Sequence, residues 1–294
     1  MAGLHAKSVR RREDQRLLTG QGTYAADAAP PGMAVVYFLR SPHAHADIVR
    51  IDTTGARTLQ GILGVFTASD LTDISPIPGG IGFQRLDGNP APKTDRPLLA
   101  HDRVRFVGEP VAMVIAETRT AAQDAAEAIA VEYAPRPVVT DPMAALEDGA
   151  ATVWDEVPDN LGFLWQRGDA AEAAAALAQS AHVTRLTFSV SRVTANPLEP
   201  RGAWACLAPD GRIELHASHQ SPFALRNGLA AGVFQVAPAD IRVLPGDVGG
   251  SFGMKSGVHL EPALVAWAAR RLNRPVRWIA DRTEGFLTDE PARE

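Results

Sequence analysis

The sequence predicts an α+β fold in two parts, residues 21–145 and residues 169–294. In the first part, predicted strands, singly or two in succession, alternate with helices in the order β-α-β-α-β, which is typical of a small mixed domain. Residues 146–168 carry proline and glycine and show no periodicity, which indicates a linker between the parts. In the second part, alternating strand-like runs are interspersed with longer helical patterns. Residues 1–20 are basic and polar, and we expect them to form an N-terminal arm.

The first part contains short runs that alternate between polar and apolar residues or are continuously apolar, and both patterns predict strands. We expect strands at residues 33–39, 46–52, 64–67, 111–116 and 131–133. A short helix is expected to begin at Ala56 and to end at Gly61, and an alanine-rich amphipathic helix is expected over residues 120–130. Residues 75–97 are rich in glycine and proline and lack periodicity, so we expect a long loop there.

The second part begins with a run of alanine, which has a high helix propensity but little side chain to bury. We expect helices at residues 170–180, 222–233 and 258–272, and strands at residues 184–192, 212–217 and 241–244. The last helix places Leu260, Leu264 and Trp267 on one face, as an amphipathic helix does. Asn273 is expected to cap the C-terminus of this helix, because Pro275 follows closely.

The composition argues against several classes of protein. A formal net charge of −5 argues against nucleic-acid binding, which usually requires a basic surface. Cys206 is the only cysteine, so the chain can form no intrachain disulfide and cannot by itself hold an iron–sulfur cluster. We expect Cys206 to be a buried apolar residue. No apolar run approaches the length needed to cross a membrane, and the N-terminus lacks the apolar core of a signal peptide, so the cytoplasm is the expected location.

A glycine-rich segment from Asp247 to Lys255 contains Gly249, Gly250 and Gly253 and is the strongest candidate for a ligand site. Because glycine has no Cβ atom, it allows a ligand to approach main-chain N–H groups closely. It also relieves steric crowding where a tight turn connects a strand to a helix. The spacing matches neither the G-x-G-x-x-G pattern of dinucleotide sites nor the G-K-[ST] ending of a P-loop. The glycines alone therefore leave a structural and a ligand-binding role open.

Three further features each have a structural and a functional interpretation. Gln220 can donate and accept hydrogen bonds at once, either toward a ligand or at the end of a strand. His43 and His45 point to the same face of a strand, but no acidic or cysteine partner is identifiable, so we do not expect them to bind a metal ion. Glu199 and Arg201 lie two positions apart and are expected to form a buried ion pair with a structural role.

Motifs that span the whole chain point to a family. They are Arg12-Glu-Asp-Gln-Arg-Leu-Leu-Thr-Gly20, Phe38-Leu-Arg-Ser-Pro-His-Ala-His-Ala46, Arg105-Phe-Val-Gly-Glu-Pro-Val-Ala112, Asn196-Pro-Leu-Glu-Pro-Arg-Gly202, the segments of Gln220 and Gly249, and Arg274-Pro-Val-Arg-Trp278 with Asp281-Arg-Thr-Glu284. Together and in this order, they resemble the large, molybdenum-cofactor-binding subunit of the xanthine dehydrogenase, aldehyde oxidase and aerobic carbon monoxide dehydrogenase family.

The resemblance implies an α/β hammerhead domain over residues 21–145, followed by the first part of a mixed α+β molybdenum-cofactor-binding domain over residues 169–294. The large subunit of this family is normally far longer than this chain, which is expected to be a split or truncated piece of it. The resemblance therefore implies three partners: a chain with the second half of the large subunit, an iron–sulfur small subunit and a medium subunit that carries FAD. The catalytic base is expected in the missing half, so no catalytic residue is expected in this chain.

The same resemblance implies a cofactor site. The expected cofactor is molybdenum–molybdopterin cytosine dinucleotide, shared with the missing half, while iron–sulfur clusters and FAD belong to partner subunits. Gln220 and Phe252 are expected to lie near the molybdenum, with no direct protein ligand to the metal. Gly249, Gly250 and Gly253 are expected to lie against the cofactor, and the isolated chain is expected to be inactive.

The implied activity is the oxidation of an aldehyde, carbon monoxide or an N-heterocycle, with water as the oxygen source and electrons passed to the partner subunits. Ser256 stands where the purine-oxidising branch has a glutamate that contacts the substrate, which argues against xanthine. The missing second half leaves open another class of function, a non-catalytic interaction subunit or a truncated remnant. An unrelated nucleotide-binding domain is disfavoured, because the glycine pattern is wrong and no acidic residue lies where a ribose contact is expected.

Overall fold

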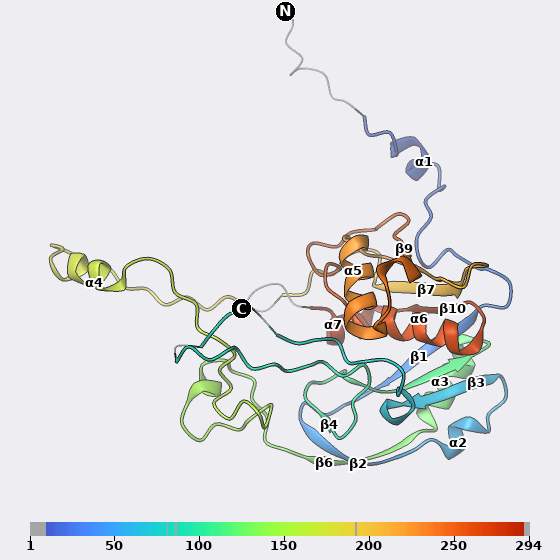
Figure 1. The fold of residues 1–294 in the computed structure, drawn as a ribbon, viewed down its shortest axis with the longest axis horizontal. Coiled ribbons are helices and arrows are strands. Elements are labelled where there is room, and N and C mark those ends of the chain that lie inside the picture. The colour runs from blue at the N-terminus through green and yellow to red at the C-terminus, as the bar shows by residue number, and fades with distance from the viewer. Residues whose placement is uncertain (1–9, 81, 86, 192, 291–294) are drawn as a thin grey trace, which may run out of the picture.

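The computed structural model describes residues 10–80, 82–85, 87–191 and 193–290, and its centre is a seven-stranded mixed sheet (Figure 1). In spatial order, the strands are β3 (Ile62–Thr67), β5 (Pro110–Ala116), β1 (Ala34–Arg40), β10 (Val276–Ile279), β7 (Gly202–Leu207), β8 (Ile213–Ala217) and β9 (Ile241–Leu244). A separate three-stranded sheet contains β4 (Arg103–Val104), β2 (Ala46–Asp52) and β6 (Ala130–Pro135) in that order. The α+β class predicted from the sequence is therefore confirmed.

The two parts of the chain share the large sheet. β1 from the first part pairs in parallel with β10 from the second part, with Ala34 opposite Val276 and Val35 opposite Arg277. β3, β5 and β1 come from the first part, and the four strands from β10 to β9 come from the second. Strands from both parts are therefore joined by main-chain hydrogen bonds into one continuous sheet.

Helices cover this sheet on both faces, which the burial of β5 makes clear. Met113 and Ile115 belong to the core that α6 (Leu260–Leu272) also lines, whereas Ala112, Val114 and Ala116 belong to the core that α3 (Arg119–Glu127) also lines. Side chains alternate between the two faces of a strand, so one continuously apolar strand can serve two cores. This explains the unbroken apolar run in the sequence.

The other helices mostly fall where the sequence places them. The helix predicted over residues 222–233 is confirmed as α5 (Pro222–Gly228), which continues into a π-helical turn over Leu229–Phe234. Asn273 ends α6 in the left-handed conformation with φ of +48°, so the predicted cap is confirmed. The remaining helices are α1 (Asp14–Leu18), α2 (Thr54–Arg57), α4 (Ala170–Ala178) and α7 (Arg282–Thr288). The predicted N-terminal arm lies outside the described residues up to position 9, and the rest of it contains α1.

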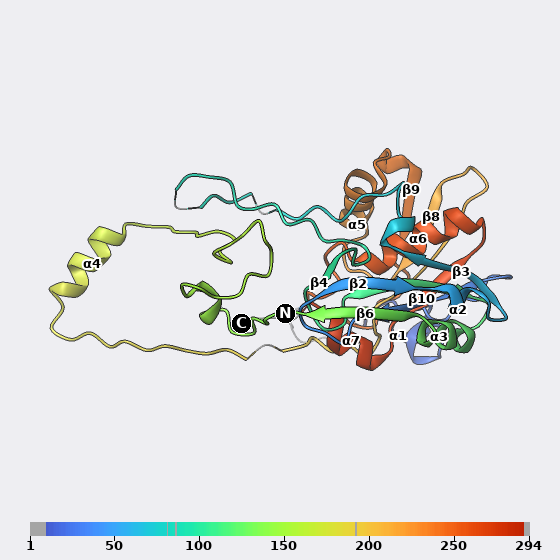
Figure 2. The same ribbon diagram turned by 90° about the horizontal axis from the view of Figure 1, so that it is seen from below.

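The strand predicted over residues 184–192 is wrong, because residues 184–191 are extended but pair with no other strand (residue 192 lies outside the described residues). Leu186 and Phe188 are 72% and 80% exposed. α4 also buries no residue, and Figure 2 shows it far from the body of the molecule with the chain on either side. We refer to residues 164–191 as the projecting segment. The alternating pattern is that of a strand, but a strand forms only where a partner supplies the other half of its hydrogen bonds.

Candidate cofactor site

The glycine loop, which we define as residues 245–257, connects β9 to α6. Gly250 and Gly253 have φ values of +102° and +101°, which residues with a Cβ atom rarely adopt. A Cβ atom on Gly249 would lie 2.5 Å from the Cβ of Glu199, so this glycine allows a close approach between two segments. Phe252 has a φ of +54° and a side chain that is 75% exposed. The loop thus needs its glycines for its backbone path, whatever it binds.

Gln220 lies just beyond the end of β8 and contacts this loop twice. Its backbone N–H donates to the carbonyl oxygen of Lys255 at 3.0 Å, and the hydroxyl of Ser251 donates to its side-chain Oε1. Because Oε1 accepts from Ser251, the amide NH2 of Gln220 is the group left to donate. The structure therefore brings together Gln220 and the glycine loop, which are some thirty positions apart in the sequence.

Lys255 is a buried residue of the site that the sequence analysis did not single out. Its side chain is 0% exposed, and its Nζ donates to the backbone oxygen of Glu199 and to Ser218 Oγ, both at 2.7 Å, and lies 3.2 Å from Glu199 Oε2. Burial lowers the pKa of the Lys255 ammonium, and the carboxylate of Glu199 opposes this effect. The sequence contains only three lysines, at positions 7, 93 and 255, and this rarity is the one signal that could have drawn attention to Lys255.

Glu199 does not pair with Arg201, so the ion pair predicted between them is wrong. The Oε2 of Glu199 instead accepts from the Gly249 N–H at 2.8 Å and from Ser218 Oγ at 2.5 Å, in addition to its contact with Lys255. The other carboxylate oxygen, Oε1, is buried and has no hydrogen-bond partner within the described residues. Glu199 and Arg201, on either side of Pro200, therefore belong to two separate networks of polar contacts. Their spacing in the sequence could not show this.

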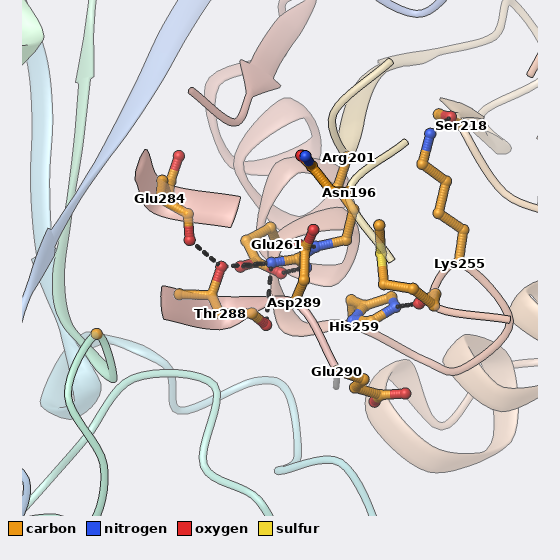
Figure 3. A network of polar contacts seen from close by, with 12 residues as sticks. Asn196, Arg201, Ser218, Lys255, His259, Glu261, Glu284, Thr288, Asp289 and Glu290 are labelled. Atoms are coloured by element: carbon orange, nitrogen blue, oxygen red, sulfur yellow. Dashed lines mark hydrogen bonds and ion pairs between the residues drawn. The ribbon is translucent and has the colours of Figure 1, made fainter. Parts of the chain in front are cut away.

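Arg201 belongs to a second buried network, shown in Figure 3. Its guanidinium contacts both carboxylate oxygens of Glu261, at 2.6 and 3.1 Å, and Asp289 at 2.7 Å. Glu261 also accepts from Arg40 at 3.0 Å, and Arg40 in turn contacts Glu284 at 2.7 Å. Burial by itself would raise the pKa of Glu261, but Arg201 and Arg40 lower it far below its ordinary value. This network connects β1, α6, α7 with the adjoining Asp289, and the residue just before β7.

A third ion pair anchors the N-terminal segment to the glycine loop. Arg16 donates to both oxygens of Asp247 at 2.6 Å, and the Thr23 N–H donates to Asp247 Oδ2 at 2.7 Å. The hydrogen bond from Arg16 holds the pKa of Asp247 well below its ordinary value. Residues from the start of the chain therefore help to fix the start of the loop.

The remaining candidates lie as follows. Ser256 is exposed in the glycine loop, and its hydroxyl donates to the backbone oxygen of Gly253 at 2.6 Å. The His43 ring packs against Tyr133, with 4.8 Å between ring centroids, and His45 Nδ1 lies 2.8 Å from the backbone oxygen of Pro137. Cys206 is only partly buried, not fully buried as expected.

The glycine loop and Gln220 offer hydrogen-bonding groups and open space to a ligand. Across the described ranges of the chain, no cluster of three or more His, Cys, Asp or Glu side chains could hold a metal ion. By contrast, a Cβ atom built on Gly253 meets nothing within 4 Å, so the main chain here faces open space. The exposed Gln220 lies at the same loop, and its amide supplies a hydrogen-bond donor. These residues fit a polar, oxygen-rich group held by hydrogen bonds.

Comparisons with known proteins identify the family. Residues 19–137 match the model of the aldehyde oxidase and xanthine dehydrogenase a/b hammerhead domain, and residues 153–294 match that of the molybdopterin cofactor-binding domain. The chain therefore belongs to the family of molybdopterin-binding large subunits that includes xanthine dehydrogenase, aldehyde oxidase and carbon monoxide dehydrogenase. The fold predicted from the motifs, a hammerhead domain followed by part of a molybdenum-cofactor-binding domain, is confirmed.

Similar proteins extend over nearly the whole chain. It is 37% identical to the nicotine 6-hydroxylase large subunit of Paenarthrobacter nicotinovorans, with 98% of this chain and 35% of that protein covered. The solved structure of quinoline 2-oxidoreductase from Pseudomonas putida 86 is 41% identical with a TM-score of 0.86, covering 98% of this chain and 36% of that one. Carbon monoxide dehydrogenase from Oligotropha carboxidovorans is 30% identical with a TM-score of 0.88, with the same coverage. The chain thus spans about a third of the length of these relatives.

No helix in the described ranges is both long and apolar enough to cross a membrane.

Proposed function

We propose that this chain forms one part of the large subunit of a molybdenum hydroxylase and supplies one wall of its cofactor site. The observation that supports the proposal is the contact between Gln220 and the glycine loop. At Gly253 the main chain of this loop faces open space, where a ligand could approach it. The residues that would hold the cofactor are Gln220, Gly249, Gly250, Phe252 and Gly253. When bound, molybdenum–molybdopterin cytosine dinucleotide supplies the oxygen-transfer and redox chemistry, with water as the oxygen source.

The contribution of the chain's own residues is positioning and hydrogen bonding. The NH2 group of Gln220 is available to donate, because Ser251 already occupies its Oε1. Preorganised donors of this kind stabilise developing charge without reorganisation of the protein during the reaction. No group of this chain is proposed as the catalytic base, and we propose that the isolated chain is inactive.

We propose an N-heterocycle as the substrate. Ser256 offers a hydroxyl that is already bonded to Gly253, so this side of the pocket provides no carboxylate to pair with the ring N–H groups of a purine. A site that cannot pair the polar groups of a substrate discriminates strongly against it. Two relatives at 37% and 41% identity are named for nicotine and quinoline, which are N-heterocycles. These observations favour N-heterocycles over aldehydes, carbon monoxide and xanthine.

The proposed partners are a polypeptide with the rest of the large subunit, an iron–sulfur subunit and an FAD subunit, assembled in the cytoplasm. The projecting segment supports the first of these. It exposes Leu186, Phe188 and Val190 at alternate positions, by 72%, 80% and 51%, and its backbone has no strand partner within the described residues. Exposed apolar side chains of this kind mark a contact surface, and an unpaired extended backbone can add a strand to a partner.

An activity panel on the assembled complex, with an artificial electron acceptor, tests the proposal. We expect faster turnover of quinoline and pyridine substrates than of aldehydes, carbon monoxide or xanthine. A preference for xanthine would contradict the assignment of Ser256. The absence of turnover on every substrate, together with the absence of molybdenum, would favour the alternative of a non-catalytic interaction subunit, for which the exposed projecting segment is also suited.

A further inference from the structure

Buried polar groups beneath the glycine loop connect three separate segments. Lys255 lies at the end of the loop, Ser218 lies just beyond β8, and Glu199 lies in the segment that precedes β7. The Lys255 ammonium donates to the other two residues at distances of 2.7 to 3.2 Å. Figure 3 shows its extended side chain directed at Ser218. A compact ammonium with three donors can reach several acceptors at once, which suits such a junction.

The Glu199 carboxylate and the backbone of Lys255 make the contacts that fix the loop. Within the loop, the Gly249 N–H donates to Glu199 Oε2 at 2.8 Å. At its end, the Lys255 carbonyl accepts from the Gln220 N–H at 3.0 Å, and the Lys255 N–H donates to Ser251 Oγ at 3.0 Å. Ser251 is the residue that orients the Gln220 amide. The carboxylate of the ion pair therefore holds Gly249, while the backbone of Lys255, whose side chain is the other partner, contacts Ser251 and Gln220.

We propose that Glu199 and Lys255 are positioning residues, which fix the glycine loop and Gln220 relative to each other so that both face the same ligand. This proposal rests on the proposed function, since the ligand it invokes is the molybdopterin cofactor. The buried Oε1 of Glu199 has no hydrogen-bond partner within the described residues, so the carboxylate contacts Gly249, Ser218 and Lys255 through Oε2 alone.

Stability alone does not account for this arrangement. A buried ion pair contributes little net stability compared with apolar residues of similar volume, because both charges lose their hydration. The Glu199 carboxylate of this pair instead accepts from the Gly249 N–H of the loop, and the Lys255 ammonium connects that carboxylate and Ser218 to the C-terminal part of the loop. The structure thus assigns the pair to the geometry of the loop.

The test compares Lys255→Met, Glu199→Gln and the double variant in the assembled complex with Lys93→Met as the matched control. Lys93 is 69% exposed and lies 3.6 Å from Asp95, so its replacement removes a lysine without touching the loop. Three quantities are measured for each variant: hydrogen–deuterium exchange of residues 247–257, the melting temperature and the molybdenum content. Exchange and melting report on the protein itself and do not require activity.

We expect Lys255→Met to accelerate exchange in residues 247–257 at least tenfold and to lower the molybdenum content, with exchange in α3 unchanged. The double variant removes both charges, so it is expected to recover the melting temperature but not the slow exchange or the molybdenum content. Slow exchange of the loop in Lys255→Met, or full recovery of all three quantities in the double variant, would overturn the proposal. A wild-type complex without molybdenum would contradict the proposed function instead, and the exchange of the loop would still decide whether the pair positions it.

Discussion

Replacement of Glu261 by glutamine is expected to destabilise the protein, because this carboxylate is the centre of the buried charge network. Its side chain is 2% exposed, and it contacts Arg201, which is 4% exposed, and Arg40, which is 10% exposed. Glutamine keeps the shape of the side chain but has no charge, and its NH2 group would face guanidinium donors. The variant therefore leaves two buried arginines without one of their counter-charges.

The expected loss of stability is about 3 kcal/mol, at the lower end of the 3–5 kcal/mol that follows removal of one partner from a buried ion pair. The lower end applies because each arginine keeps another carboxylate. Arg201 retains Asp289 at 2.7 Å, and Arg40 retains Glu284 at 2.7 Å. Glu290→Gln is the matched control, because its contact with Arg96 at 3.4 Å is exposed on both sides and is expected to contribute less than about 1 kcal/mol.

Urea unfolding monitored by tryptophan fluorescence measures both variants, since Trp267 and Trp278 are buried in the core. A loss in Glu261→Gln no larger than that in Glu290→Gln would refute the reasoning. The pH dependence has a definite sign. Burial would raise the pKa of Glu261, but the two arginines lower it well below 4.5, so its stabilising contribution is complete above pH 4.5 and is lost as the pH falls further. The difference between wild type and Glu261→Gln is therefore expected to shrink below pH 4.5.

Two further predictions concern the loop. Gln220→Ala in the assembled complex is expected to reduce turnover by about 10²-fold, because one preorganised hydrogen-bond donor is lost. The melting temperature is expected to stay unchanged. Unchanged turnover in steady-state kinetics would show that Gln220 is a structural residue. Gly249→Ala is expected to destabilise the chain by about 1–3 kcal/mol in urea unfolding, because the new Cβ would lie 2.5 Å from the Cβ of Glu199. Gly162→Ala, where the Cβ meets nothing within 4 Å, is the control, and equal losses in the two variants would contradict this account.

Local elements were predictable from the sequence because their patterns depend on neighbours along the chain. The apolar run of β5 and the cap at Asn273 were found in this way. The pairing of β1 with β10 was not, because it joins residues from opposite ends of the chain and leaves no local pattern. The strand expected at residues 184–192 shows the converse case, in which a clear alternating pattern has no partner within the described residues.

The candidate site divides in the same way. The glycine loop and Gln220 were found through motifs, and the structure brings them together, while their role toward a cofactor stays a prediction. The ion pair expected between Glu199 and Arg201 was wrong, because spacing in sequence does not specify which distant charge each side chain meets. Lys255 was missed for the same reason, since its burial depends on groups from two distant segments.

The molybdenum content of the protein tests the central claim most directly, namely that this chain supplies one wall of a shared molybdopterin site. Elemental analysis is made on the complex purified through this chain and on the 294-residue chain expressed alone. We expect stoichiometric molybdenum in the complex and little on the isolated chain. A complex without molybdenum would contradict the cofactor assignment, and stoichiometric molybdopterin on the isolated chain would contradict the claim that the site is shared.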